Sequence, residues 1–213
     1  MGRIRVGVVA SGRGTNFQSL VEARSLGKLD VDLAVLVCNV PGAGVFERAR
    51  QAGVPTVLID HTKFGSDREA FEREVVATLK GYGVDLVVHA GFMRIVTPYY
   101  IGEFRNRILN IHPSLLPAFP GAHAQRDALA AGVNVSGCTV HFVDETVDGG
   151  PILLQQPVAV HSDDTEDRLA SRILAREHVL LPLAVQLFAS GFIRVVGKRA
   201  FIEEPDTSFP RDL

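Results

Sequence analysis

The first half of the chain alternates between continuous apolar runs and stretches whose apolar residues recur every three or four positions. The apolar runs predict strands at 4–10, 32–39, 56–60 and 84–91. The periodic stretches predict helices at about 16–27, 44–53 and 67–83. This order predicts a parallel α/β sheet with right-handed crossovers. Because the strands are apolar throughout, helices are expected to cover both faces of the sheet.

The pattern changes in the second half. Two strands, expected at 136–143 and 151–160, are joined by the short loop "DETVDGG". A long helix is expected from about Thr165 to Ser190, and a hairpin that turns near Gly197 follows. We find no internal repeat and no linker. The predicted fold is α/β: a single Rossmann-like domain, 1–213, with a mostly parallel twisted sheet flanked by helices and antiparallel additions in the C-terminal half.

Composition narrows the functional class. The chain has 213 residues and a formal net charge of -2, with no tryptophan and no run of basic residues, so a nucleic-acid partner is not expected. No apolar run approaches the roughly 20 residues that cross a bilayer, so no membrane partner is expected either. Cys38 and Cys138 lie in apolar strands and are interpreted as core thiols of a cytoplasmic protein without a signal peptide.

A glycine-rich loop, "VVASGRGTNFQ" (8–18), follows the first strand and opens the first helix. Gly12 and Gly14 permit tight turns, and a helix N-terminus attracts anions. Thr15 and Asn16 can cap the helix or bind phosphate oxygens. The loop lacks the third glycine of a dinucleotide fingerprint and the lysine of a P-loop. It therefore indicates a phosphate monoester site, or else a capped glycine turn that binds nothing.

The stretch "ILNIHPSLLPAFPG" (108–121) ends a strand with polar residues and prolines. Asn110 and His112 are two residues apart and point to the same side of an extended chain. Pro113 restricts the backbone that follows. An amide that donates to an oxyanion beside an imidazole that moves protons suits acyl transfer. The alternative is that both side chains only satisfy loop backbone groups.

Three further features are unusual. Asp148 lies in a glycine-containing loop, where it is either a partner that orients and charges His112 or an ordinary turn residue. Apolar residues at 92–96 form either a ligand wall or a helix contact, and Arg94 among them could pair with a carboxylate. Glu177 falls inside the apolar stripe of the long helix, where a buried carboxylate needs a ligand, an arginine or an edge position.

A metal site is not expected. His112, His123, His141 and Asp148 could cluster, but none of them shows the spacing of a zinc motif.

Five motifs together resemble one enzyme family. They are "SGRGTN", "AGFMRI", "NIHPSLLP", "VHFVDETVDGGPI" and "REHVLLP", in this order between about 4 and 191. The chain resembles the phosphoribosylglycinamide formyltransferases, the folate-dependent enzymes of purine synthesis. The resemblance implies transfer of a formyl group from 10-formyltetrahydrofolate, a co-substrate, to the amine of 5-phosphoribosylglycinamide. It also implies small-molecule substrates, no metal, and a monomer or homodimer.

The resemblance also assigns roles to individual positions. The implied catalytic trio is Asn110, His112 and Asp148. The implied ribonucleotide-binding positions are Gly14, Thr15, Asn16, Leu174 and Glu177. The implied folate-binding positions are Arg68, Met93, Arg94, Ile95, Val96, Asn110 and Asp144. They divide the domain into a nucleotide-phosphate half (about 1–100), a folate and catalytic half (about 101–190) and a hairpin tail (about 191–213). Gln125 departs from the family, in which many members carry a histidine.

Rival interpretations remain. Methionyl-tRNA formyltransferase would need a further basic domain, and formyltetrahydrofolate deformylase an N-terminal regulatory domain. A nucleotide-binding module without catalysis is a third possibility, but a pure binder has no need of the trio.

Overall fold

The predicted strands and helices are present, with bounds that differ by a few residues. The computed structural model describes residues 2–203. Its strands are β1 (Arg5–Ala10), β2 (Asp32–Cys38), β3 (Thr56–Leu58), β4 (Leu86–His89), β5 (Ile108–His112), β6 (Val135–Phe142), β7 (Ile152–Ala159), β8 (Ile193–Val196) and β9 (Arg199–Ile202). Its helices are α1 (Thr15–Ser25), α2 (Val45–Gln51), the 3-10 turn η1 (His61–Phe64), α3 (Arg68–Gly81), α4 (Pro98–Glu103), α5 (Ala124–Ala130) and α6 (Glu166–Ala189). The sequence patterns did not predict η1, α4 or α5, because short helices carry too few turns to show a period.

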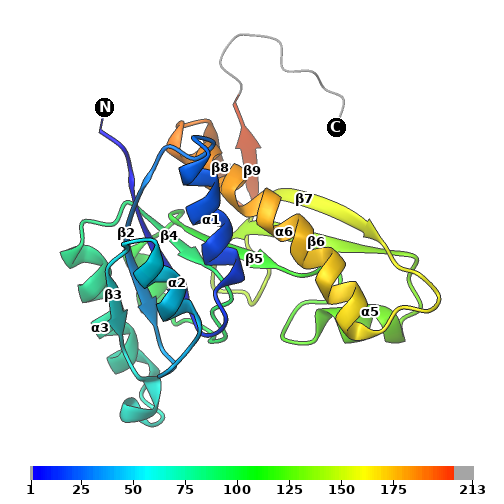
Figure 1. Cartoon of the computed structure of the whole chain (residues 1–213), viewed down its shortest axis with the longest axis horizontal. Helices are drawn as coiled ribbons and strands as arrows, with labels where there is room; N and C mark the ends of the chain where they lie inside the picture. The colour runs from blue at the N-terminus through cyan, green and yellow to red at the C-terminus, as the bar shows by residue number, and fades with distance from the viewer. Residues whose placement is uncertain (1, 204–213) are drawn as a thin grey trace.

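The sheet confirms the predicted fold class. Its strand order is β3-β2-β1-β4-β5-β6-β7, and the pairs from β3 to β5 are parallel. Strands β6 and β7 join in antiparallel fashion, as expected for the C-terminal half. The β8–β9 hairpin is a separate two-stranded sheet that turns at Gly197, next to β7 (Figure 1). The last part of the predicted tail lies outside the described residues.

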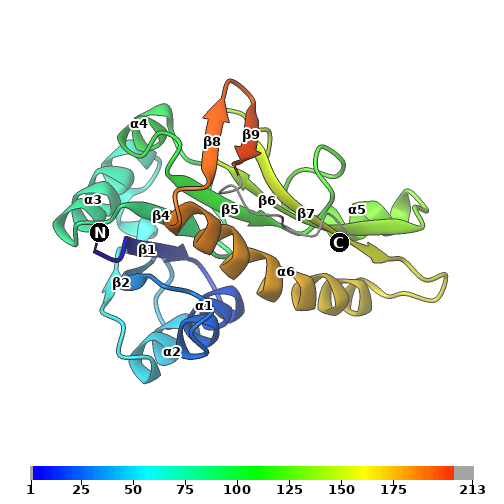
Figure 2. The ribbon, with the colours of Figure 1, turned by 90° about the horizontal axis from the view of Figure 1, so that it is seen from above.

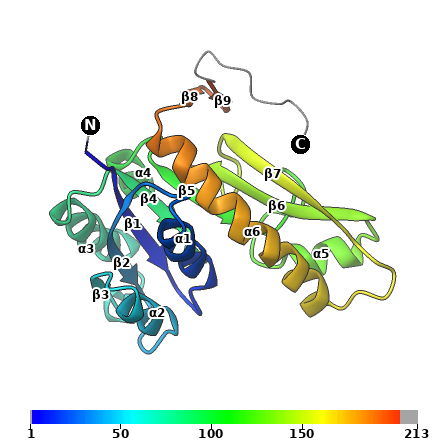
Figure 3. The same cartoon turned by 45° about the horizontal axis from the view of Figure 1, so that its top comes forward.

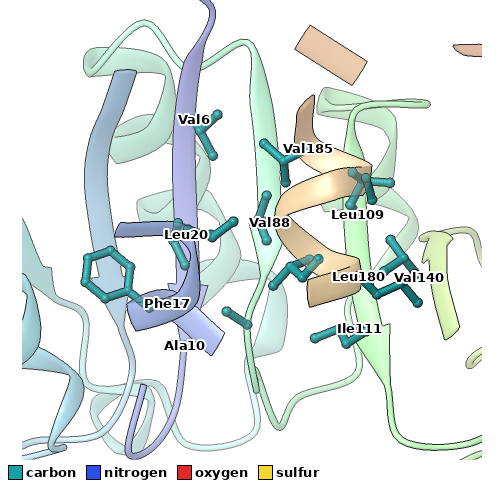
Figure 4. Packing of buried hydrophobic residues seen from close by; sticks show 14 of the residues in the cluster. Val6, Ala10, Phe17, Leu20, Val88, Leu109, Ile111, Val140, Leu180 and Val185 are labelled. Carbon is teal, nitrogen blue, oxygen red and sulfur yellow. The ribbon is translucent and has the colours of Figure 1, made fainter. Parts of the chain in front are cut away.

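Helices cover both faces of the sheet, as the apolar strands predicted. Helices α1, α2 and α6 lie on one face, and α3 and α4 on the other (Figure 2). Alternate residues of β1 serve the two sides: Val6 and Val8 pack toward α1 and α6, whereas Val9 packs toward α3. Figure 4 shows the first of these cores, where Leu20 and Val185 meet side chains of the central strands.

Helix α6 connects the two halves. It lies across the sheet between α1 and the C-terminal strands (Figure 3), and it contacts α1, α5, β5, β6 and β7. Leu169, Ile173, Leu181 and Val185 form its buried stripe and are all fully buried. Between residues 2 and 203, no helix is both long and apolar enough to span a lipid bilayer.

Candidate active site

The unusual residues of the sequence lie together at the carboxyl ends of the parallel strands. Strands β1, β4 and β5 are parallel neighbours, so the loops that follow them leave from the same edge. Those loops contain the glycine-rich segment, the apolar segment at 91–97 and the proline-rich segment after His112. The carboxyl edge of a parallel sheet is where ligands bind in open α/β folds.

A row of polar side chains crosses three adjacent strands at this edge. The strand register places His89 of β4 opposite Asn110 of β5, and Asn110 opposite His141 of β6. All three line a cavity of about 100 Å³. Polar side chains at neighbouring register positions on the same cavity indicate a binding or catalytic site.

Asn110 is oriented by His141. The Nδ1 atom of His141 lies 2.9 Å from the carbonyl oxygen of Phe142, which can only accept, so Nδ1 carries the proton. Burial lowers the pKa of His141, so its ring is neutral at neutral pH. Its Nε2 therefore accepts a hydrogen bond from Asn110 Nδ2 at 3.1 Å. The second N–H of Asn110 remains to be donated to a ligand in the cavity.

His112 meets Asp148, as the sequence suggested. Its Nδ1 lies 3.4 Å from Asp148 Oδ2, and its Nε2 lies 2.9 Å from the carbonyl oxygen of Phe119. Both ring nitrogens thus face acceptors, an arrangement that a doubly protonated imidazolium satisfies fully. His112 is only 4% exposed and does not line the cavity, whereas Asn110 and Asp148 do. The structure therefore brings Asn110 to the ligand side and places His112 behind Asp148.

Asp148 is held in an uncommon backbone conformation. Its φ is 51°, a left-handed value that few residues other than glycine adopt. Its Oδ2 also accepts from the backbone N–H of Gly121 at 2.8 Å. A Cβ atom at Gly150 would lie 1.9 Å from the Phe142 carbonyl oxygen, so the loop can close against β6 only with glycine there. This loop fixes the carboxylate between His112 and the cavity.

The predicted folate positions lie around the same cavity and its neighbour. The cavity is lined by Arg94, Ile95, Val96, Asn110 and Asp144, together with Asp148 and His89. A second, adjacent cavity of about 220 Å³ is lined by Arg68, Met93, Arg94 and Ile95. The apolar side chains of Met93 and Ile95 are 77% and 57% exposed. This supports the ligand-wall interpretation for Met93 and Ile95, whereas Phe92 and Val96 pack against the core beside α3 and α4, which was the alternative.

Arg94 makes a different contact from the one suggested by the sequence. Its guanidinium lies over the Phe71 ring, 5.1 Å from the centroid. Burial raises the pKa of the nearby Glu72 carboxyl, and hydrogen bonds from Thr97 and then the positive charge of Arg94 partly oppose this rise. Arg94 therefore faces the cavity from an aromatic support, with a carboxylate nearby.

The glycine-rich loop turns sharply into α1. Gly14 is the N-cap residue with a left-handed φ of 76°, and a Cβ there would lie 2.4 Å from a methyl group of Val45. Neither Thr15 nor Asn16 caps the helix by a side-chain hydrogen bond, so the first of their two suggested roles, capping the helix, is wrong. Glycine at this position leaves the N–H groups of the first turn of α1 for a ligand.

Asn16 and Glu177 form a buried polar pair. Asn16 Nδ2 donates to Glu177 Oε2 at 2.8 Å, and the two residues are 8% and 6% exposed. The partner of Glu177 is thus an amide of α1, not an arginine. Burial raises the pKa of Glu177, and Asn16 Oδ1 has no hydrogen-bond partner within the described part of the chain. Leu174, one turn before Glu177, is half-buried. A buried polar atom without a partner, such as Asn16 Oδ1, indicates a ligand contact.

No group of three histidine, cysteine or acidic side chains capable of holding a metal ion is found among residues 2–203.

Two site residues were missed from the sequence. His141 was considered only as a metal ligand, and His89 was treated as part of a strand. Burial lowers the pKa of His89 to about 3, so it is a neutral wall of the cavity, bonded to the Tyr100 hydroxyl at 3.1 Å. Strand register decides both roles, and a register between distant strands is not visible in one sequence.

Comparisons with known proteins agree with this geometry. The formyl transferase family model matches residues 4–185. Phosphoribosylglycinamide formyltransferase of Escherichia coli K12 is 40% identical over 92% of this chain and 92% of its own length. The trifunctional purine biosynthetic protein adenosine-3 of Drosophila melanogaster is 45% identical over 89% of this chain, which spans only 14% of that protein. The crystal structure of glycinamide ribonucleotide transformylase 1 from Symbiobacterium toebii is 48% identical, with a TM-score of 0.92 over 95% of both chains.

The match covers the segments that build the site, from β1 and its glycine-rich loop to most of α6. The chain belongs to the formyl transferase family.

Proposed function

We propose that the chain transfers the formyl group of 10-formyltetrahydrofolate to the amine of 5-phosphoribosylglycinamide. The products are formylglycinamide ribonucleotide and tetrahydrofolate, a step of purine biosynthesis. The observation that carries this proposal is the row of Asn110 and His141 beside Asp148 on one cavity, with His112 behind it. The names of the two full-length relatives reported above support the same activity.

Asn110 is the oxyanion donor. The amine nitrogen attacks the formyl carbon, and the carbonyl oxygen gains negative charge as the tetrahedral intermediate forms. One N–H of Asn110 is fixed on neutral His141, which aims the second N–H at the cavity. A preorganised donor stabilises the oxyanion without reorganising at the moment of reaction.

Asp148 carries the proton that passes from the amine to the folate nitrogen, and His112 supports it. The attacking amine must lose a proton, and the folate nitrogen must gain one before it leaves. Asp148 lines the cavity and is therefore the group within reach of the reacting atoms. His112, held between Asp148 and the Phe119 carbonyl, supplies positive charge that stabilises both the carboxylate and the oxyanion.

The two substrates bind on either side of this centre. The turn at Gly14 and the start of α1, with Thr15, hold the phosphate, and Glu177 and Asn16 bind the glycinamide end with Leu174 beside them. The folate lies against Arg68 and residues 93–96 and beneath the loop that contains Asp144. Holding amine and formyl carbon together removes much of the entropic barrier.

We further propose that the enzyme needs no metal, binds neither nucleic acid nor membranes, is a monomer or homodimer and works in the cytoplasm.

The first experiment is a spectroscopic assay with 10-formyltetrahydrofolate, with and without 5-phosphoribosylglycinamide. We expect folate turnover only when the ribonucleotide is present. Turnover without it would identify a deformylase, in which water replaces the amine. No turnover in either case would leave a binding module and refute the proposed transfer.

A further inference from the structure

The predicted folate segment, Gly91–Thr97, has no regular secondary structure. It connects the end of β4 to the start of α4, and two of its side chains, Met93 and Ile95, are mostly exposed. Phe92 and Val96 of this segment pack against the core beside α3, but that packing does not fix the backbone at Met93 and Ile95, whose side chains face outward. Something else must hold it if it is to present a fixed wall to a ligand.

Its C-terminal end is held by a buried carboxylate. Glu72 of α3 is 2% exposed, and its Oε1 accepts from the backbone N–H of Thr97 at 2.9 Å. Its Oε2 accepts from the Thr97 hydroxyl. Both carboxylate oxygens are thus used on one residue, the N-cap of α4. Glu72 lines neither of the two cavities assigned to the folate.

The other end is held by Ser11. Its Oγ accepts from the backbone N–H of Met93 at 2.9 Å and donates to Asn39 Oδ1 at 2.7 Å. Its own backbone N–H donates to the Gly91 carbonyl oxygen at 3.1 Å. Ser11 is also the first residue after β1, within the glycine-rich loop. One residue therefore joins the segments that flank the two proposed substrate sites.

We propose that Glu72 and Ser11 are positioning residues that fix the folate-binding segment from its two ends without touching the folate. The proposal rests on the folate site of the proposed function. Without either anchor the segment samples other conformations, and the apparent folate affinity falls in proportion to the fraction of molecules that still hold the competent one.

The test measures the dissociation constant of tetrahydrofolate by calorimetry. We expect Glu72→Gln to weaken binding about tenfold, because a neutral amide holds the backbone N–H and hydroxyl of Thr97 less strongly than a carboxylate does. Ser11→Ala should weaken binding by a similar factor, whereas Ser11→Thr keeps a hydroxyl oxygen and should restore much of the affinity. Affinity for 5-phosphoribosylglycinamide should change less than twofold in Glu72→Gln. Glu74→Gln, an exposed change on the same helix, is the matched control and should bind normally.

The outcomes are separable. Unchanged tetrahydrofolate affinity in both Glu72→Gln and Ser11→Ala would overturn the proposal. An equal loss of affinity for tetrahydrofolate and 5-phosphoribosylglycinamide in Glu72→Gln would also overturn it, because it indicates a general loss of structure. If the wild-type chain binds tetrahydrofolate but transfers no formyl group, the proposed function fails while the comparison of affinities still decides the roles of the anchors. A wild-type chain that binds no folate would refute both.

Discussion

At the scale of single residues, Asp148 carries the charge on which the proposed proton transfer depends. Asp148→Asn removes that charge but keeps the shape, and asparagine tolerates the left-handed φ of 51°. We expect kcat to fall by about 10²–10⁴-fold, the range for losing an acid–base group, with an unchanged circular dichroism spectrum. Steady-state kinetics at neutral pH measure this, and a wild-type rate would show that the carboxylate is not used.

Glu177 provides a prediction that depends on pH. Burial raises its pKa in the folded state above the ordinary value of 4.5, so the folded protein binds this proton more tightly than the unfolded chain does. Its contribution to stability is therefore full below about pH 4.5 and is lost as the pH rises through the raised pKa. We expect Glu177→Gln to unfold at higher denaturant than wild type at pH 8, with the difference vanishing toward pH 4.

The same substitution should damage function. In Glu177→Gln the ribonucleotide loses a charged hydrogen-bond partner, which costs about tenfold in affinity. KM for 5-phosphoribosylglycinamide should therefore rise, while KM for the folate stays constant. Urea titrations across the pH range and steady-state kinetics measure the two effects. Equal stability of the two proteins at pH 8 would mean that Asn16 fully compensates the buried charge.

The site residues differ in how far the sequence could reveal them. Asn110 and His112 were visible because they interrupt an apolar strand, whereas Asp148 lies in a polar loop and was assigned through the family resemblance. Their contacts were not visible, since the row that contains His141 depends on how β5 and β6 pair. The Asn16 partner of Glu177 was likewise hidden, because 161 residues separate the two in the chain.

At the scale of elements, the turn into α1 depends on glycine at one position only. Gly14→Ala places a methyl group at a left-handed φ and against Val45, whereas a Cβ at Gly12 would have no neighbour within 4 Å. We expect Gly14→Ala to lower the free energy of unfolding by about 1–3 kcal/mol and Gly12→Ala to change it little. Urea denaturation of the ligand-free proteins measures both, and equal effects would contradict the steric argument.

The long elements followed from periodicity; the short helix α2 and the short strand β3 were also predicted, but α4 and α5 were not. Strands buried on both faces and the 24-residue α6 give clear signals, and their bounds were predicted within a few residues. Helices α4 and α5 have six and seven residues, too few for a repeat to stand out. Their positions follow instead from tertiary contacts, such as the Glu72 anchor at the start of α4.

At the scale of the molecule, α6 makes the two halves depend on each other. Leu181 is fully buried in the core that α6 shares with the sheet. We expect Leu181→Ala to cost about 2–5 kcal/mol and to leave a single unfolding transition, as the single domain predicted from the sequence requires. The three tyrosines, Tyr82, Tyr99 and Tyr100, report on the N-terminal half by fluorescence, while circular dichroism reports on all helices. Separate midpoints for the two signals would show that the halves unfold as independent units.

The edges of the main sheet limit how two copies of this protein can associate. The strand at one edge, β3, has only three residues, and β7 at the other contains Pro157, which has no N–H to donate, and lies next to β9. The β3 edge is short, and the β7 edge is interrupted at Pro157. A dimer that continues the sheet from one copy into the next is therefore disfavoured, and a homodimer would form through side chains on the helical faces. The same edges protect concentrated solutions against strand-to-strand aggregation.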